Sequence, residues 1–553
     1  MKILAISLLT SMTVSSVAQS TVGQMDQSAR STEAAQERLG TVSFAVTCAP
    51  SVQASFNRGV ALLHDFWYPE AERQFGEIAK ADPSCAMAHW GVAMSSFHQI
   101  WNRPNEKAIA AGWGEMQKAQ SLSAKTSRER AYIATLSDFF RPGKQDFPER
   151  IRIYSDAMGK LYGEHPEDID AGAFYALSLL AAVPTDDTSL AANRKAMAIL
   201  TPLFAKFPDN PGVDHYIIHS CDNPAMAADG LAASDHYLEI AQSGPHAYHM
   251  PGHIYARLGL WPQDIASQLG SIKASEDAEA RGENGVHDEP HSYDFLLYAY
   301  LQSAQDAHAK AALDQSAAPL KMIASMPGMG AGYMHGMIAY YTSKLPVFYA
   351  LETRDWKSAA ALEPPNGSPP DVATLTIWGR AIAHGHLHQP AEAVADLDRY
   401  HALMDKIRKG KNAYLAEGTD VKIQQEEIVA WVHFAEDKQE GALEHMRAAA
   451  DLQDKVGQGE VDIPAREMLA DMLLELHQPQ QALKEYEVAL KLSPNRFNGL
   501  YHAGVASEAA GDKSKAERFY SALLKSTDNG SQSARPELAH AKAFLASSQT
   551  ASK

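Results

Sequence analysis

The sequence predicts an all-α chain that folds as an α-solenoid of stacked helix–turn–helix repeats. Near the C-terminal end, residues of the same kind return 34 positions apart: Ala470 and Gly504, Ala482 and Ala516, Tyr486 and Tyr520. A period of 34 residues is typical of helix pairs that stack on their neighbours. No run of strand length alternates apolar and polar residues between hairpin turn signals, so we expect no sheet. Because each repeat packs only on its neighbours, 553 residues need not divide into several separate cores.

The first 18 residues have the features of a secretory signal peptide. Lys2 gives a positive start, an apolar core runs from Ile3 to Val14, and Ser16-Val17-Ala18 offers a cleavage site of small residues. That core is too short to span a bilayer, and no later stretch has 18 uninterrupted apolar residues. We therefore expect an exported bacterial protein, periplasmic or secreted, with no membrane span. The polar residues 19–45 are predicted to be a flexible leader.

Charge and cysteine usage narrow the class of protein further. The chain has 49 Lys and Arg against 67 Asp and Glu, a formal net charge of −18, and no basic run. A nucleic-acid surface needs clustered cations, so this class is excluded. Three cysteines suit an oxidising compartment with one disulfide, and Cys48–Cys85 is the favoured pairing. Cys221 is then either a small buried hydrophobe or a soft metal ligand.

The best-defined repeats share one layout of small and aromatic residues. In residues 56–83, Gly59 allows close packing of two helices, Ala71 and Phe75 fill the space between them, and Pro83 ends the second helix. Residues 469–494 and 503–525 repeat this layout. The pattern resembles the tetratricopeptide repeat (TPR) family. The resemblance implies a right-handed superhelix whose first helices line a concave groove that binds a protein or peptide, and hence a scaffold or adaptor role.

Composition shifts divide the predicted solenoid. Residues 46–325 are expected to form an N-terminal TPR-like solenoid with a histidine-rich groove, and residues 371–530 the C-terminal TPR repeats. Between them, residues 326–370 form a joint that contains one helical repeat and is interrupted by a Gly-rich stretch and a Pro-rich stretch. Residues 531–553 are expected to form a C-terminal helix and tail.

Three His-x-x-x-His pairs lie in the centre of the chain: His215/His219, His249/His253 and His287/His291. With 23 histidines in 553 residues, roughly one pair of this spacing is expected by chance. Residues four apart share a helix face, and the first two pairs are one repeat apart (249 − 215 = 34). These pairs should therefore meet on adjacent helices.

Aligning the central repeat with the first one selects the side chains that face inward. With Gly252 placed on Gly59, His249 and His253 project inward, and His246 joins them at the spacing i, i+3, i+7. Imidazoles and carboxylates that converge from rigid helices suit zinc, copper or ferrous iron. Asp222, Asp288 and Glu289 are expected to orient the rings from outside. The predicted metal ligands are His215, His219, His246, His249, His253, His291 and Asp294.

Two other uses of these histidines remain open at the level of sequence. They could bind a carboxylate or phosphate of a groove ligand, or form a satisfied hydrogen-bond network. No His-Glu-x-x-His, Gly-x-Ser-x-Gly, P-loop or Gly-x-Gly-x-x-Gly signature supports a known catalytic site, so no catalytic residue is assigned. The alternative to a metal-binding scaffold is a metal-dependent hydrolase or oxidoreductase that uses the same cluster.

Overall fold

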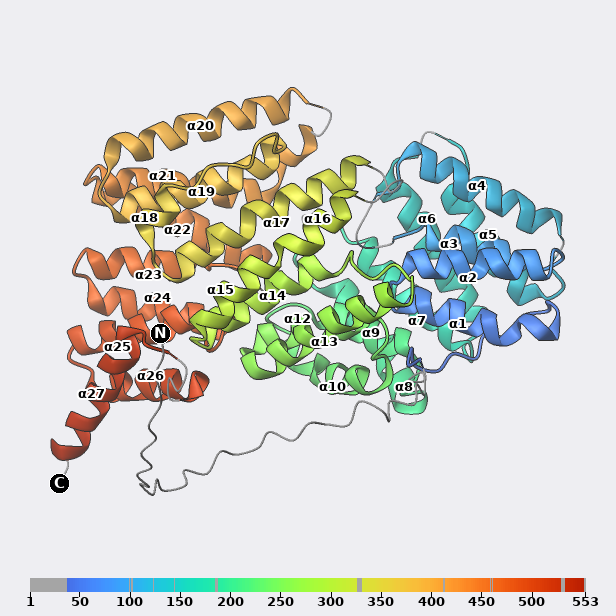
Figure 1. Ribbon diagram of the computed structural model, residues 1–553, viewed down its shortest axis with the longest axis horizontal. Helices are drawn as coiled ribbons and strands as arrows, with labels where there is room; N and C mark the ends of the chain where they lie inside the picture. The colour runs from blue at the N-terminus through green and yellow to red at the C-terminus, as the bar shows by residue number, and fades with distance from the viewer. Residues whose placement is uncertain are drawn as a thin grey trace, which may run out of the picture. The chain divides into compact units, whose positions relative to one another are not determined.

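The computed structural model describes residues 37–551 except 99, 101–102, 123, 144, 185–186, 326–330, 411–412, 458, 460 and 529–532. Within these residues every regular element is a helix, which confirms the all-α prediction (Figure 1). Consecutive helices pack on one another along the chain, as stacked helix pairs require. The right hand of the superhelix stays a prediction. Among the described helices, none is both long and apolar enough to cross a membrane.

The N-terminal half carries most of the candidate site. Its α-helices are α1 (Gln53–His64), α2 (Tyr68–Ala81), α3 (Ala86–Ser95), α4 (Glu106–Ser121), α5 (Ser127–Phe140), α6 (Phe147–Glu164), α7 (Ile169–Ala181), α8 (Ala191–Lys206), α9 (Pro211–Cys221), α10 (Leu231–Ile240), α11 (Pro245–His249) and α12 (Pro251–Leu258). Two short 3-10 helices, η1 (Pro50–Val52) and η2 (Ala227–Gly230), precede α1 and α10.

The middle of the chain contains α13 (Trp261–Ala280), α14 (Glu289–Gln302), α15 (Asp306–Gln315), α16 (Ala317–Ser325), α17 (Ala331–Glu352) and α18 (Trp356–Ala360). The C-terminal part contains α19 (Pro370–His386), α20 (Pro390–Arg408), η3 (Ala413–Glu417), α21 (Thr419–Ala435), α22 (Gln439–Val456), α23 (Ala465–Glu475), α24 (Pro479–Leu492), α25 (Phe497–Ala509), α26 (Lys513–Ser526) and α27 (Pro536–Ala551). Helices α17 and α18 both pack on α19, so the stack continues across the Pro-rich loop of the joint. The Gly-rich residues 326–330 lie outside the described part of the chain.

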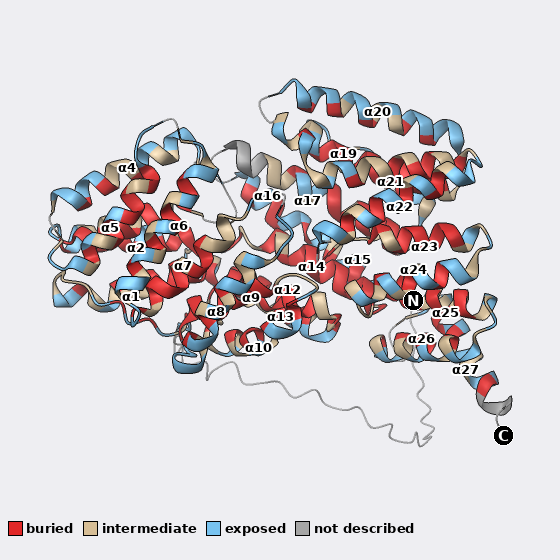
Figure 2. Ribbon diagram, turned by 180° about the vertical axis from the view of Figure 1, so that it is seen from behind, coloured by how far each residue is buried: buried red, intermediate tan, exposed pale blue. Residues whose placement is uncertain are grey.

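Small residues let the paired helices approach as the repeat pattern predicts. A Cβ added at Gly59 would lie 2.7 Å from the Phe75 ring, and one added at Gly91 would lie 2.3 Å from it. At the other end, a Cβ on Gly504 would lie 2.3 Å from Tyr520. The aromatic rings of Phe75 and Tyr520 fill the space that these glycines leave and are fully buried. Buried residues line the inner sides of the packed helices (Figure 2). This packing accounts for the TPR-like helix pairs.

The predicted flexible leader is wrong for residues 37–45. Leu39, Val42 and Phe44 are buried, and the Gly40 amide donates to the carbonyl of Ile240 at 2.9 Å. The Phe44 ring lies 5.4 Å from that of Phe56, between centroids. Apolar side chains two and three positions apart give this extended segment enough buried surface to offset the cost of ordering it. Residues 19–36 and the predicted signal peptide lie outside the described residues.

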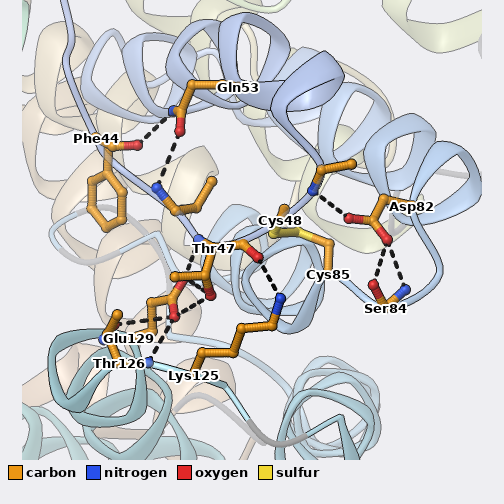
Figure 3. The surroundings of a disulfide bond; sticks show 12 residues. Phe44, Thr47, Cys48, Gln53, Asp82, Ser84, Cys85, Lys125, Thr126 and Glu129 are labelled. Carbon is orange, nitrogen blue, oxygen red and sulfur yellow. Dashed lines mark hydrogen bonds between the residues drawn. A yellow bond between two sulfur atoms is a disulfide. The ribbon is translucent and has the colours of Figure 1, made fainter.

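The predicted Cys48–Cys85 disulfide is confirmed, and hydrogen bonds hold both of its ends (Figure 3). The Thr47 amide and hydroxyl donate to Glu129, at 2.6 and 2.7–2.9 Å. The Ala49 amide donates to an Asp82 carboxylate oxygen at 2.7 Å. The disulfide therefore ties the segment before α1 to the start of α3.

Candidate metal centre

Six of the seven predicted ligands come together as two groups of three histidines. The first triad consists of His215, His219 and His246, and the second triad of His249, His253 and His291. Within each triad, one nitrogen from every imidazole lies within 4.8 Å of the others. Helix α9 supplies two histidines to the first triad, and α11 supplies one histidine to each triad. Helices α12 and α14 each supply one histidine to the second triad.

A break between two short helices places the central histidines. Helix α11 ends at His249 and α12 begins at Pro251, whose ring nitrogen has no hydrogen to donate. Met250 between them keeps helical angles, φ −57° and ψ −37°. The chain therefore continues in nearly the same direction, and His246, His249 and His253 stay on one side of it. Pro290 lies in the first turn of α14, as the sequence predicts.

In the second triad, the Nδ1 atom of every imidazole has a polar partner. His249 Nδ1 lies 2.6 Å from Gln268 Oε1, and His253 Nδ1 lies 2.9 Å from Asp222 Oδ2. His291 Nδ1 lies 3.1 Å from the Tyr341 hydroxyl (which comes from α17). Outer partners of this kind fix the orientation of metal-binding imidazoles and leave Nε2 as the ligand atom.

The partners of two of these rings also determine their tautomers. The Asp222 carboxylate accepts a hydrogen bond from Arg257 Nε at 2.9 Å and can only accept from His253, so His253 Nδ1 carries the proton. Gln268 donates its amide group to Asp264 at 2.8 Å, so its carbonyl oxygen accepts from His249 Nδ1. Both Nε2 atoms then carry lone pairs.

These two lone pairs face each other at short range. His249 Nε2 and His253 Nε2 are 2.9 Å apart, a distance at which two lone pairs repel unless a proton or a metal ion lies between them. Both side chains are buried, with exposed fractions of 1% and 8% for the residues. The second triad therefore has the donor set that a transition metal requires, and two of its rings have the suitable tautomer.

The first triad also contains neutral imidazoles. His215 Nδ1 donates to the backbone carbonyl of His64 at 2.5 Å, which leaves the lone pair on its Nε2. His246 Nδ1 lies 3.5 Å from Asp288 Oδ1. Burial lowers the pKa of His215 to about 3 and that of His246 well below its usual value. Both imidazoles are thus neutral at neutral pH, the form that binds metals.

Each triad is covered by one phenylalanine that contacts all three of its rings. The Phe66 centroid lies 4.4, 5.4 and 5.5 Å from the imidazoles of the first triad. The Phe295 centroid lies 4.9, 4.7 and 5.2 Å from those of the second triad. Phe66 adopts a left-handed backbone conformation (φ 55°) in the turn after α1. An apolar cover strengthens electrostatic interactions inside the site because it lowers the local dielectric.

Four of the six histidines are buried, and His219 and His291 are partly buried. His215, His246 and His249 are 0%, 2% and 1% exposed. Helix α1 packs directly on α9, and the turn that follows α1 brings Phe66 over the first triad. These contacts join residues about 150 positions apart, so no local pattern in the sequence reveals them.

Two predicted participants lie outside the triads. Asp294 is buried in α14, where it accepts from Lys344 Nζ of α17 at 2.5 Å. Burial lowers the pKa of Lys344 and the Asp294 carboxylate raises it, with a net upward shift. Lys344 and Asp294 therefore form an ion pair. Cys221 is buried with its sulfur 3.5 Å from that of Met197, and burial raises its pKa to about 12. It is a small buried side chain rather than a thiolate ligand.

Sequence reasoning missed Asp264 and Gln268, although the repeat register marks them. The aromatic residue that fills each terminal repeat follows the repeat glycine by 16 positions, as in Phe75 (75 − 59) and Tyr520 (520 − 504). In the central repeat the same position holds Gln268 (268 − 252), and the preceding alanine position (Ala71 in the first repeat) holds Asp264. Both are fully buried. Polar residues at core positions of a repeat are costly unless they are hydrogen-bonded, as Gln268 is to His249 and Asp264.

Comparison with known proteins adds little to this geometry. No protein-family model matches the chain, and no curated protein matches it in sequence. Solved structures that match include the TPR domain of P58(IPK), 12% identical, covering 90% of this chain and 99% of that chain, with a TM-score of 0.20. A human IFIT1 dimer with PPP-AAAA is 11% identical, and the match covers 84% of this chain and 88% of that chain, with a TM-score of 0.33. A human IFIT1 dimer with m7Gppp-AAAA is 10% identical, and the match covers 80% of this chain and 90% of that chain, with a TM-score of 0.34.

Proposed function

We propose that this protein is an exported bacterial helical-repeat protein that binds a transition-metal ion through His249, His253 and His291. The observation that carries the proposal is the 2.9 Å contact between the Nε2 atoms of His249 and His253. Metal–nitrogen bonds of about 2.0–2.1 Å in tetrahedral geometry would separate two ligand nitrogens by about 3.3 Å. The His249–His253 pair therefore needs to open by only a few tenths of an ångström to hold zinc, copper or ferrous iron, and a nitrogen of His291 lies within 4.8 Å of this pair.

Export is supported by the disulfide as well as by the N-terminal sequence. Disulfides persist in oxidising compartments such as the bacterial periplasm. The test is expression of the full chain in a Gram-negative host, followed by fractionation and N-terminal sequencing. We expect periplasmic protein that starts at Gln19, and full-length protein retained in the cytoplasm would refute this part of the proposal.

The ion would serve either a scaffold or an enzyme. The TPR-like helix pairs favour a protein or peptide partner, as the resemblance implies. The alternative, a metal-dependent hydrolase or oxidoreductase, is favoured by the number of ligands, since catalytic sites typically combine three protein ligands with one water. Water-proton relaxation of the Cu²⁺-loaded protein separates the two. Fast exchange of a bound water supports the enzyme, and its absence supports the scaffold.

Metal content decides the central claim. Untagged protein is stripped with chelator, reconstituted with Zn²⁺ or Cu²⁺, dialysed and measured by mass spectrometry. We expect bound metal in the wild type and its loss from the second triad in His249→Ala/His253→Ala, whereas the exposed His308→Ala retains the wild-type content. Circular dichroism confirms that the variants fold. A wild type that retains no ion after reconstitution would refute the proposal.

A further inference from the structure

We infer that the first triad is a second transition-metal site, so that the protein holds two ions in one binuclear centre. The inference rests on the proposed function of the second triad and adds a site to it. Its ligands would be His215, His219 and His246, and the ions it would take are divalent first-row metals that prefer imidazole.

The first argument is a buried nitrogen of His215 that lacks a protein partner. His215 is fully buried, and its Nδ1 proton is committed to the His64 carbonyl. The other nitrogen, Nε2, is buried without a hydrogen-bond partner in the protein. Burying such a lone pair without a partner is unfavourable, and a bound cation would offset this cost. One nitrogen of His215 lies within 4.8 Å of nitrogens from His219 and His246.

The second argument is that both triads share one construction. In each, an i, i+4 pair from one helical stretch is joined by a histidine from another helix: His215 and His219 with His246, and His249 and His253 with His291. Each triad has a carboxylate near one Nδ1 atom, Asp288 in the first and Asp222 in the second. Each has one phenylalanine against all three rings. A construction that suits a metal in one triad suits it in the other.

The third argument is the distance between the triads. His246 and His249 lie three positions apart on α11, and their ring centroids are 5.9 Å apart, yet they belong to different triads. Two ions bound there would be neighbours, as in sites where a pair of metals acts on one bound group. Asp222 and Asp288 beside the rings offset part of the added positive charge.

Copper titration tests the inference, with Cu²⁺ alone as the probe. Chelator-stripped protein is reconstituted, dialysed and analysed for metal per chain. We expect two ions in the wild type and in His308→Phe, one in His215→Phe, one in His253→Phe and none in the double variant. Phenylalanine keeps the ring volume and removes both nitrogens, and circular dichroism verifies folding. If a variant does not fold, competition by Zn²⁺ for two classes of Cu²⁺ site in the wild type gives the same count.

Electron paramagnetic resonance then tests whether the sites are adjacent. Each single variant should give an isolated Cu²⁺ signal of one spin per chain, whereas the wild type should give a signal broadened or lost by coupling between the two ions. One ion in the wild type that persists in His215→Phe would overturn the inference and leave the proposed function intact. Two uncoupled spins would overturn the binuclear centre. No ion in the wild type would refute the proposed function and the inference together.

Discussion

Gly252→Ala should weaken metal binding without touching a ligand. Gly252 lies on α12 where this helix faces α13, and a Cβ added there would lie 1.9 Å from Gln268 Nε2 and 2.7 Å from Asp264 Oδ1. Both side chains are fully buried, so the Gln268 amide must leave its position. Its bond to His249 Nδ1, now 2.6 Å, would then be lost or stretched.

The size of the effect follows from the role of that bond. Loss of an outer hydrogen bond to a metal ligand typically costs 10- to 100-fold in metal affinity, or about 1.4–2.7 kcal/mol. Overpacking should also lower the free energy of unfolding of the metal-free protein by about 1–3 kcal/mol. Competitive titration with a chromophoric chelator measures the affinity, and urea unfolding measures the stability.

Gly504→Ala is the matched control. It occupies the same repeat position, and its Cβ would lie 2.3 Å from Tyr520, whose ring packs on Tyr501 and Phe544 near the C-terminus. It should lose stability and keep the wild-type affinity. Gln268→Leu removes the acceptor without overpacking and should reproduce the loss of affinity. If Gly252→Ala and Gln268→Leu both bind metal as tightly as the wild type, Gln268 does not orient His249 and the tautomer argument fails.

Four further outcomes are expected. Asp222→Asn should lower metal affinity 10- to 100-fold in the same titration, because the charged partner of His253 is lost; an unchanged affinity would contradict the assigned role. Burial holds the pKa of His215 at about 3 against 6.5 when unfolded, so below pH 6.5 only the unfolded chain gains this proton. As the pH falls from 6 to 4, the metal-free wild type should therefore lose about 1.4 kcal/mol of stability per pH unit relative to His215→Phe. Urea unfolding measures the free energy of unfolding at each pH, and an equal pH dependence in the two proteins would contradict the prediction. Asp294→Asn should cost about 3–5 kcal/mol of stability by breaking a buried ion pair, yet leave the metal content unchanged. Cys221 should be the one thiol that reacts with Ellman's reagent under non-reducing conditions, and only after denaturation, since burial raises its pKa to about 12; reaction in the native protein would show that it is exposed.

The repeat fold was predictable because its signals are local and periodic. Gly59 and Phe75, or Gly504 and Tyr520, recur at fixed spacings, and each pair makes its contact within one repeat. The same reasoning placed His249 and His253 on one side of a helix and identified Asp222 as an outer partner. It failed for residues 37–45, where a segment of few apolar residues finds a surface built from later helices.

The sequence by itself determined which histidines share a helix face and that the first two pairs are one repeat apart, and it placed the six histidines of the triads in one predicted cluster. Tertiary structure decided that they divide into two triads, in each of which two of the three histidines are buried, and which nitrogen carries the proton in His215, His249 and His253. The physical reason is that a tautomer depends on its hydrogen-bond partner, and these partners come from other parts of the chain. The carbonyl that holds the His215 ring belongs to His64, 151 positions earlier, and the hydroxyl beside His291 belongs to Tyr341, 50 positions later.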